Sequence, residues 1–185
     1  MSRQEYRFSG FGGQGVITIT HIVGRAATVH AGMHATMTEA YGPEKTGGFS
    51  RGDVVVSEDP IDYPAVIEPD MVVAFSQDAF ERDADSVEED GLVVVEENLV
   101  DPSEFAEDRP DVRIVEVPAV EIAEEVGRKV VANIVMLGAV NSLIGTPPED
   151  AVREAILDIV PEGTEEMNTE AFERGLTALD REVVA

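Results

Sequence analysis

The sequence predicts an α/β protein: a single Rossmann-like domain over residues 1–185, with a mainly parallel sheet, helices on both of its faces and a helical C-terminal third. A short strand near the N-terminus runs into a glycine turn and a helix, later strands carry valine on both faces, and helical patterns follow Pro118. Valine on both faces of a strand indicates a sheet that is covered on both sides. A chain of 185 residues can bury about 70% of its unfolded surface in one core.

Six strands and two helices are expected before Pro118. The first helix follows the glycine turn, has apolar positions that include Ile17, Val23 and Ala27, and stops at Gly32. The segment before the fourth strand contains three prolines and is therefore expected to be a connection. The expected strands are residues 6–13, 33–42, 53–57, 70–76, 91–99 and 112–119, the helices are 14–32 and 77–84, and the loops are 43–52 and 58–69.

The remaining chain is predicted to be helical. Residues 120–145 predict one long helix or two helices joined at Gly127. Small residues within this segment are Ala132, Gly138 and Ala139. They permit close helix contacts, which suit a core helix and, as a second interpretation, an assembly surface. The apolar run from Val130 is too short to cross a membrane comfortably.

Two further helix starts follow from capping patterns. Thr146-Pro147-Pro148-Glu149 places Thr146 at the N-cap, Pro147 in the first turn and Glu149 where it closes a capping box. Asn168 is predicted to cap the last helix, residues 169–179.

The charge is strongly acidic, with 38 acidic against 13 basic residues and a formal net charge of −25. The acids are spread along the whole chain, which favours a general acidic surface suited to a salt-rich, halophilic cytoplasm over an acidic docking face for a basic partner. Nucleic-acid binding is disfavoured because there is no basic stripe. The polar N-terminal stretch has no signal-peptide core, so a cytoplasmic location and no membrane partner are expected.

The N-terminal glycine turn carries a known spacing. Gly10, Gly12 and Gly15 satisfy G-x-G-x-x-G, and Gly13 lies between them. A helix N-terminus after such a turn points backbone N–H groups at a phosphate or carboxylate. A dinucleotide site also needs an acid about 20 residues further on, and Glu39 is the candidate. The alternative is that the glycines only let the strand and the helix pack closely.

A second glycine motif spans residues 39–57. Gly42 and Pro43 break a strand, and Gly47 and Gly48 allow close backbone approach. Lys45 and Arg51 are cations in an otherwise acidic chain, which favours an anion site for phosphate or carboxylate. A loop buried against another subunit, with Arg51 paired to an acid, is an equal alternative.

No catalytic or metal-binding set is found in the sequence. His30 and His34 are separated by Gly32, and His21 has no companion ligands at suitable spacing. The chain contains no cysteine, so Cys-ligated iron–sulfur clusters, disulfides and thiol nucleophiles are excluded. There is no G-x-S-x-G motif either. No catalytic residue is therefore predicted.

Nearly the whole chain resembles the gamma subunit of the 2-oxoacid:ferredoxin oxidoreductases, and the pattern looks closest to the 2-oxoglutarate type, with the pyruvate and ketoisovalerate types related. The stretches that carry the resemblance are "GFGGQGV", "TEAYGPEKTGGFSRGDVVVS", "PIDYP", "PDMVVAFSQDAF", "VPAVEIAEEVGRKVVANIVMLGAV" and "PEGTEEMNTEAFERG". The resemblance implies a complex that converts 2-oxoacid, CoA and oxidised ferredoxin into acyl-CoA, CO2 and reduced ferredoxin. It also implies that this chain is a non-catalytic subunit.

The resemblance also implies partners and cofactors. Alpha and beta subunits would hold thiamine diphosphate and Mg²⁺, iron–sulfur clusters would lie on other subunits, and a ferredoxin-like delta subunit and ferredoxin complete the partners. This chain would support assembly and the CoA side of the site. The positions carried over are Gly10, Gly12, Gly13, Gln14, Gly15, Tyr41, Gly42, Lys45, Gly47, Gly48 and Arg51. Thr46 stands where the family often has arginine, and Lys45 precedes it.

Two other functions remain open from the residues alone. A free-standing dinucleotide-binding protein follows from the glycine fingerprint with Glu39. An assembly module without any ligand follows from the absence of a catalytic set.

Overall fold

The computed structural model describes residues 3–43 and 47–181, and Lys45 lies outside these residues. Its six strands form one sheet in the order β2-β3-β1-β4-β5-β6. The strands are β1 (Gln4–Phe11), β2 (His34–Tyr41), β3 (Phe49–Ser57), β4 (Met71–Ala74), β5 (Leu92–Glu96) and β6 (Arg113–Val117). The helices are α1 (Val16–Arg25), which continues as the π-helical turn η1 (Ala26–His30), α2 (Gln77–Asp83), α3 (Ser103–Asp108), α4 (Ala119–Val126), the short η3 (Lys129–Val131), α5 (Ala132–Ile144), α6 (Glu149–Ile159) and α7 (Glu165–Leu176).

The predicted α/β class is confirmed, and the sheet is mixed. Strands β1, β4, β5 and β6 run parallel to one another, whereas β3 is antiparallel to both β1 and β2. A parallel connection needs a crossover of a dozen or more residues, usually a helix. The connection between Tyr41 and Phe49 is too short for one, so β2 and β3 form a hairpin. The hairpin places β2 at the edge of the sheet.

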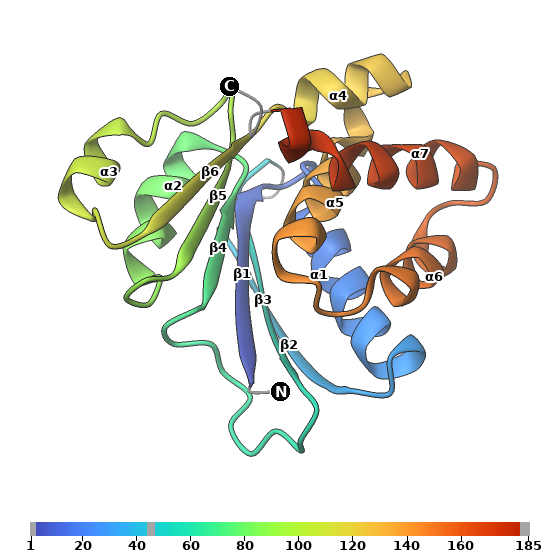
Figure 1. The fold of residues 1–185 in the computed structure, drawn as a ribbon, viewed down its shortest axis with the longest axis horizontal. Helices are drawn as coiled ribbons and strands as arrows, with labels where there is room; N and C mark the ends of the chain where they lie inside the picture. The colour runs from blue at the N-terminus through green and yellow to red at the C-terminus, as the bar shows by residue number, and fades with distance from the viewer. Residues whose placement is uncertain (1–2, 44–46, 182–185) are drawn as a thin grey trace.

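Helices cover both faces of the sheet, as predicted. Helices α2 and α3 lie on one face, and α1, α5, α6 and α7 lie on the other (Figure 1). The larger core joins inward side chains of the sheet, such as Phe8, to Ile19, Leu137 and Phe172 from the second group of helices. A smaller core around Val72 and Phe80 lies beneath α2 and α3. The helical C-terminal third is also confirmed.

Several boundaries differ from the prediction. Strand β3 begins at Phe49, not at residue 53, because residues 49–52 pair with β1 and residues 50–52 pair with β2 as well. Residues 120–145 form two helices separated at Gly127, whose φ of 129° breaks the first one. The short helix α3 was not predicted. Helix α5 lies in the core, the favoured of the two interpretations, since its residues 132–141 are all buried.

Both predicted caps are wrong. Pro148, whose ψ of 144° is extended, occupies the N-cap of α6, so the helix starts at Glu149 and Thr146 lies before it. Helix α7 starts earlier than predicted, with Thr164 at its N-cap. Asn168 therefore lies within the first turn, where its Nδ2 donates to the carbonyl oxygen of Thr164 at 2.8 Å.

Candidate functional site

The two glycine motifs meet in one cleft of about 1120 Å³, here called the glycine cleft. It lies where β1 ends and α1 begins, and the starts of β3, α5 and α7 complete its walls. Its lining residues are Phe11, Gly12, Gly13, Gly15, Val16, Ile17, Thr18, Tyr41, Gly42, Gly47, Gly48, Phe49, Ser50, Arg128, Val130, Val131, Asn133, Ile134, Ile159, Val160, Pro161, Thr164, Met167 and Asn168. Segments far apart in the sequence thus line a single cleft.

Backbone contacts hold the two glycine motifs together. The backbone N–H of Gly12 donates to the carbonyl oxygen of Gly48 at 2.8 Å. Gly15 is the N-cap of α1 with φ of 77°, a left-handed conformation that favours glycine. A Cβ at Gly15 would also lie 2.2 Å from Nδ2 of Asn133, so the Asn133 side chain at the start of α5 occupies the space beside this turn.

The Gln14 side chain stabilises the glycine turn, and Gly10 leaves room for it. Oε1 of Gln14 accepts from the backbone N–H of Phe11 at 2.7 Å, and its Nε2 donates to the carbonyl oxygen of Phe75 at 2.9 Å. A Cβ at Gly10 would lie 2.6 Å from the same Oε1. The Gln14 amide therefore needs the glycine, and it ties β1 to the end of β4.

The electrostatics of the cleft favour an anion. The first intrahelical bond of α1 is donated by Ile19 to Gly15, so the N–H groups of residues 16–18 have no partner within the helix. No side chain caps this helix, and no acid lies in its first turn. Together with the helix dipole, these N–H groups attract negative charge. Arg128 adds a guanidinium that is exposed and makes no ion pair with any described residue.

The predicted site residues divide between the two faces of the sheet. Those that line the cleft are Gly12, Gly13, Gly15, Tyr41, Gly42, Gly47 and Gly48. Arg51 lies elsewhere: its Nη1 donates to Oδ1 of Asp83 at 3.1 Å, and its Nε lies 3.7 Å from Oδ1 of Asp53. Asp53 is also bound by the buried Arg7. Arg51 is thus part of a network of ion pairs with Asp53 and Asp83 next to α2.

Glu39, the candidate ribose ligand of a dinucleotide site, is hydrogen-bonded to two side chains of this chain. Its Oε1 lies 2.6 Å from Nε2 of His21, and its other oxygen accepts from the hydroxyl of Tyr41. Hydrogen bonds from Tyr41 and then from His21 hold the pKa of Glu39 below its usual value. Its strand, β2, does not neighbour β1, whereas the fingerprint places the ribose acid at the end of the parallel strand after the helix.

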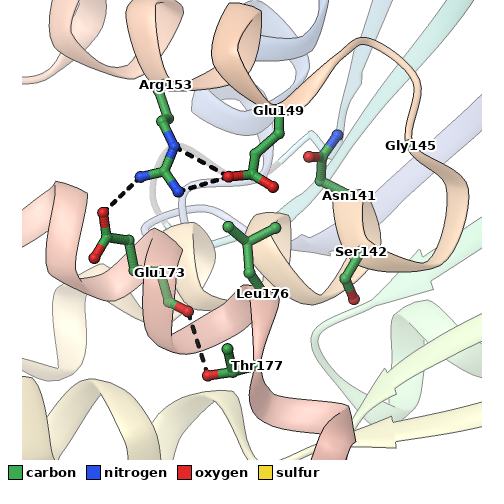
Figure 2. Close-up of a pocket in the computed structure, with 8 residues that line it drawn as sticks. All are labelled: Asn141, Ser142, Gly145, Glu149, Arg153, Glu173, Leu176 and Thr177. Carbon is green, nitrogen blue, oxygen red and sulfur yellow. Dashed lines mark hydrogen bonds and ion pairs between the residues drawn. The ribbon is translucent and has the colours of Figure 1, made fainter.

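A second cavity, of about 710 Å³, lies between α5, α6 and α7. Figure 2 shows Arg153 at its side, where the guanidinium donates at 2.6 Å to both Glu149 and Glu173. The cation is therefore neutralised, in contrast to Arg128.

Neither a metal-binding cluster nor a membrane-spanning helix occurs among the described residues. No three histidine, aspartate or glutamate side chains in residues 3–43 and 47–181 are grouped so that they could hold a metal ion. Over the same residues, no helix combines the length and apolar character needed to cross a membrane.

The wall of the cleft opposite the glycines was not predicted from the sequence. Arg128 and the apolar side chains of Val130, Ile159 and Met167 come from three segments that meet only in the folded chain. One signal was present: "GRKVV" holds two adjacent basic residues, Arg128 and Lys129, in a chain with only 13.

A family model and individual relatives all relate this chain to the same group of enzymes. The family model for pyruvate ferredoxin/flavodoxin oxidoreductase matches residues 5–178. The chain is 46% identical over 174 residues to the 2-oxoglutarate synthase subunit KorC of Methanocaldococcus jannaschii, over 94% of this chain and 92% of that relative. It is 38% identical over 151 residues to the ketoisovalerate oxidoreductase subunit VorA of Methanothermobacter marburgensis, over 81% of this chain and 30% of the relative.

The fold also matches a solved structure of similar length. The crystal structure of the keto/oxoacid ferredoxin oxidoreductase gamma subunit from Geobacter sulfurreducens superposes with a TM-score of 0.84 at 32% identity. The match covers 98% of both chains.

Proposed function

Because this chain belongs to the pyruvate ferredoxin/flavodoxin oxidoreductase family, we propose that it is the gamma subunit of a 2-oxoglutarate:ferredoxin oxidoreductase. The complex converts 2-oxoglutarate, CoA and oxidised ferredoxin into succinyl-CoA, CO2 and reduced ferredoxin, and this subunit contributes no catalytic group. Similarity over 94% of the chain to a subunit of 2-oxoglutarate synthase supports the gamma-subunit role and the choice of 2-oxoacid.

The proposed partners are the alpha and beta subunits of the same enzyme, together with a ferredoxin-like delta subunit and ferredoxin, in the cytoplasm. Thiamine diphosphate and Mg²⁺ are assigned to alpha and beta. Iron–sulfur clusters are assigned to other subunits, because this chain contains no cysteine that could ligate one. Residues 1–185 then form a single gamma-subunit domain.

The glycine cleft is proposed as the part of this chain that faces the substrate CoA. The observation that carries this proposal is the convergence of both glycine motifs, through the Gly12–Gly48 hydrogen bond, beside the unpaired cation Arg128. The N–H groups at the start of α1 and the Arg128 guanidinium suit phosphate oxygens. The apolar wall around Val130 and Met167 suits the less polar parts of the same molecule.

A free-standing dinucleotide-binding protein is less well supported. Glu39 is bound to His21 and Tyr41 on an edge strand that does not neighbour β1. The fingerprint glycines are present, but the strand and the acid that would bind the ribose are not in the arrangement that the fingerprint requires.

Reconstitution tests the subunit role. Alpha and beta subunits from the same source are assayed with and without this chain for CoA-dependent reduction of ferredoxin or a viologen dye, with 2-oxoglutarate, pyruvate and ketoisovalerate as substrates. Activity that requires the chain and prefers 2-oxoglutarate is expected. Full activity without the chain would disprove the role.

A matched pair of variants tests the CoA side of the cleft. Arg128→Ala is expected to raise the KM for CoA about tenfold, the effect of losing one charge-assisted contact. Arg113→Ala is the control, because Arg113 is also exposed and makes no ion pair with a described residue but lies on β6, away from the cleft. Equal KM values for the two variants in intact complexes would contradict the assignment.

A further inference from the structure

Aromatic residues line the glycine cleft, but their side chains point to different faces of the sheet. They are Phe11, Tyr41 and Phe49. Successive residues of a strand point to opposite faces, and residues paired across two strands point to the same face. Phe11 pairs with Phe49, and the guanidinium of Arg82 on α2 lies 3.8 Å from the centroid of the Phe49 ring. Both phenylalanine side chains therefore point to the face that α2 covers.

The Tyr41 side chain points to the opposite face, which α1 covers and on which the cleft lies. Tyr41 pairs with Ser50, and Ser50 pairs with Gly10. An added Cβ at Gly10 would lie 2.9 Å from the side chain of Val16 at the start of α1, which identifies this face. Tyr41 is also 63% exposed, so its ring is not part of the core. The cleft thus has an aromatic ring available to a ligand at the end of β2.

Hydrogen bonds hold this exposed ring in place. The Tyr41 hydroxyl donates to one carboxylate oxygen of Glu39, and the other oxygen, Oε1, lies 2.6 Å from Nε2 of His21 on α1. The bond to Glu39 also raises the pKa of Tyr41 above its usual value, so the hydroxyl keeps its proton and continues to donate. A free side chain would move among several rotamers, and a ligand would have to immobilise it. The contacts through Glu39 to His21 therefore pre-organise the Tyr41 ring.

The cleft combines two kinds of recognition. The N–H groups at the start of α1 and the Arg128 guanidinium suit phosphate oxygens. A fixed aromatic ring suits the face of a planar base. In CoA both features belong to the nucleotide end, which carries phosphates and adenine, whereas the pantetheine arm contains no ring. The geometry of the cleft therefore favours the nucleotide end.

We propose that Tyr41 binds the adenine base of CoA by stacking, and that Glu39, held by His21, is a positioning residue that acts through Tyr41. The nucleotide end of CoA then lies in the glycine cleft, and its thiol arm leads away from this chain toward the subunits that carry out the reaction. The proposal rests on the proposed function, because it takes CoA as the ligand of the cleft. It adds which end of CoA this chain binds and which side chain recognises the base.

The nucleotide fragment of CoA tests which end is bound. In the reconstituted complex, adenosine 3′,5′-bisphosphate is expected to compete with CoA. Tyr41→Ala is expected to raise both the Ki of this fragment and the KM for CoA at least about fivefold, and to leave kcat and the KM for 2-oxoglutarate unchanged. Tyr63→Ala is the control, because Tyr63 is 56% exposed but does not line the cleft. Circular dichroism verifies that every variant is folded.

A double-mutant cycle tests the positioning role. Tyr41→Phe keeps the ring but loses the bond to Glu39, and Glu39→Ala removes the same bond from the other side. Each should raise the KM for CoA about threefold, the effect of one exposed hydrogen bond. The double variant should be no worse than either single variant, because only one bond is lost. Glu39→Gln keeps an acceptor for the Tyr41 hydroxyl and should restore most of the affinity. Effects that multiply in the double variant would overturn the positioning role.

The outcomes separate this proposal from the proposed function. If Arg128→Ala raises the KM for CoA but Tyr41→Ala does not, or if the fragment does not compete in the parent complex, the adenine assignment is wrong and the CoA side of the cleft stands. The assignment is also overturned if Tyr41→Ala raises the KM for CoA but leaves the Ki of the fragment unchanged, since the ring then contacts another part of CoA. If neither Tyr41→Ala nor Arg128→Ala changes the KM for CoA, both proposals fail.

Discussion

Tyr6 is a side chain whose surroundings control its ionisation. It is 1% exposed, and its hydroxyl donates to Oε1 of Gln4 at 2.7 Å. Burial, assisted by the negative charge of Asp70, raises the pKa of Tyr6 far above its usual value. The folded chain therefore keeps this proton at a pH at which the unfolded chain loses it.

The raised pKa of Tyr6 determines how the stability of the fold changes with pH. The stability contributed by neutral Tyr6 is fully present below the unfolded pKa of about 10 and is lost as the pH rises above it. Tyr6→Phe should cost about 1 kcal/mol of unfolding free energy near neutral pH, because a hydrogen bond is lost. It should also make the chain less sensitive to alkali, since phenylalanine has no proton to lose.

Urea unfolding measured near pH 8 and near pH 10.5, on either side of the tyrosine pKa, tests this expectation. The difference between parent and Tyr6→Phe should shrink or reverse at the higher pH. Tyr63→Phe, at a site that is 56% exposed, serves as the control. A difference that is the same at both pH values would contradict the expectation.

The alternation of side chains along a strand explains why Arg51 lies outside the glycine cleft, where it was expected. The prediction treated residues 43–52 as a loop, in which neighbouring side chains can point the same way. In the structure, Ser50 and Arg51 belong to β3, and successive residues of a strand point to opposite faces. Ser50 lines the glycine cleft, so Arg51 points to the other face and contacts Asp83.

At the scale of elements, α5 and α7 pack with glycines at their contact. A Cβ at Gly138 would lie 2.3 Å from the carbonyl oxygen of Phe172, and one at Gly175 would lie 2.1 Å from that of Val135. The two backbones are therefore in direct contact, which explains why the apolar helix carries small residues. The sequence indicated close helix contacts here, although it could not identify α7 as the partner.

Gly138→Ala tests this contact, because helix propensity and packing predict opposite signs. In an exposed helix the change would stabilise the chain by about 1 kcal/mol. Here it should destabilise the chain by about 1–3 kcal/mol, because the added methyl group meets backbone atoms that cannot move aside freely. Urea unfolding measures the difference, with Ser142→Ala on the exposed side of α5 as control. A variant more stable than the parent would show that the helices are not in backbone contact.

The elements themselves were largely predictable, and their partners were not. All six strands and both N-terminal helices follow from apolar periodicity and glycine or proline breaks. Strand direction and pairing depend on contacts between distant segments, so the hairpin was not predicted. The same limit applies to the cleft. Spacing identified its glycines, but Arg128, Val130 and Met167 are brought to them only by the packing of α5 and α7.

At the scale of the whole molecule, the charge of −25 acts against compaction. The described ion pairs join the few basic side chains to a minority of the acids, and most other acids remain at the surface. Mutual repulsion among surface acids is screened by salt, with a screening length of about 10 Å at 0.1 M and about 3 Å at 1 M.

The melting temperature should therefore rise with KCl concentration. An increase of at least about 3 °C between low and molar KCl is expected, which corresponds to roughly 1 kcal/mol in a chain of this size. Scanning calorimetry measures it, and sucrose, which is excluded from the protein surface but does not screen charge, serves as control. A midpoint that does not respond to KCl would show that the acidic surface does not limit stability.

The β2–β3 hairpin has a consequence for how genomes are interpreted. A search that asks only for three glycines at the right intervals would place this chain among nicotinamide-dependent dehydrogenases. What separates the two groups is what comes after the strand that follows the first helix: in this chain the polypeptide turns back at once into β3, which pairs antiparallel with both β1 and β2 and leaves β2 at the sheet edge. A classifier that also requires a crossover-length segment after that strand would distinguish them without any structure.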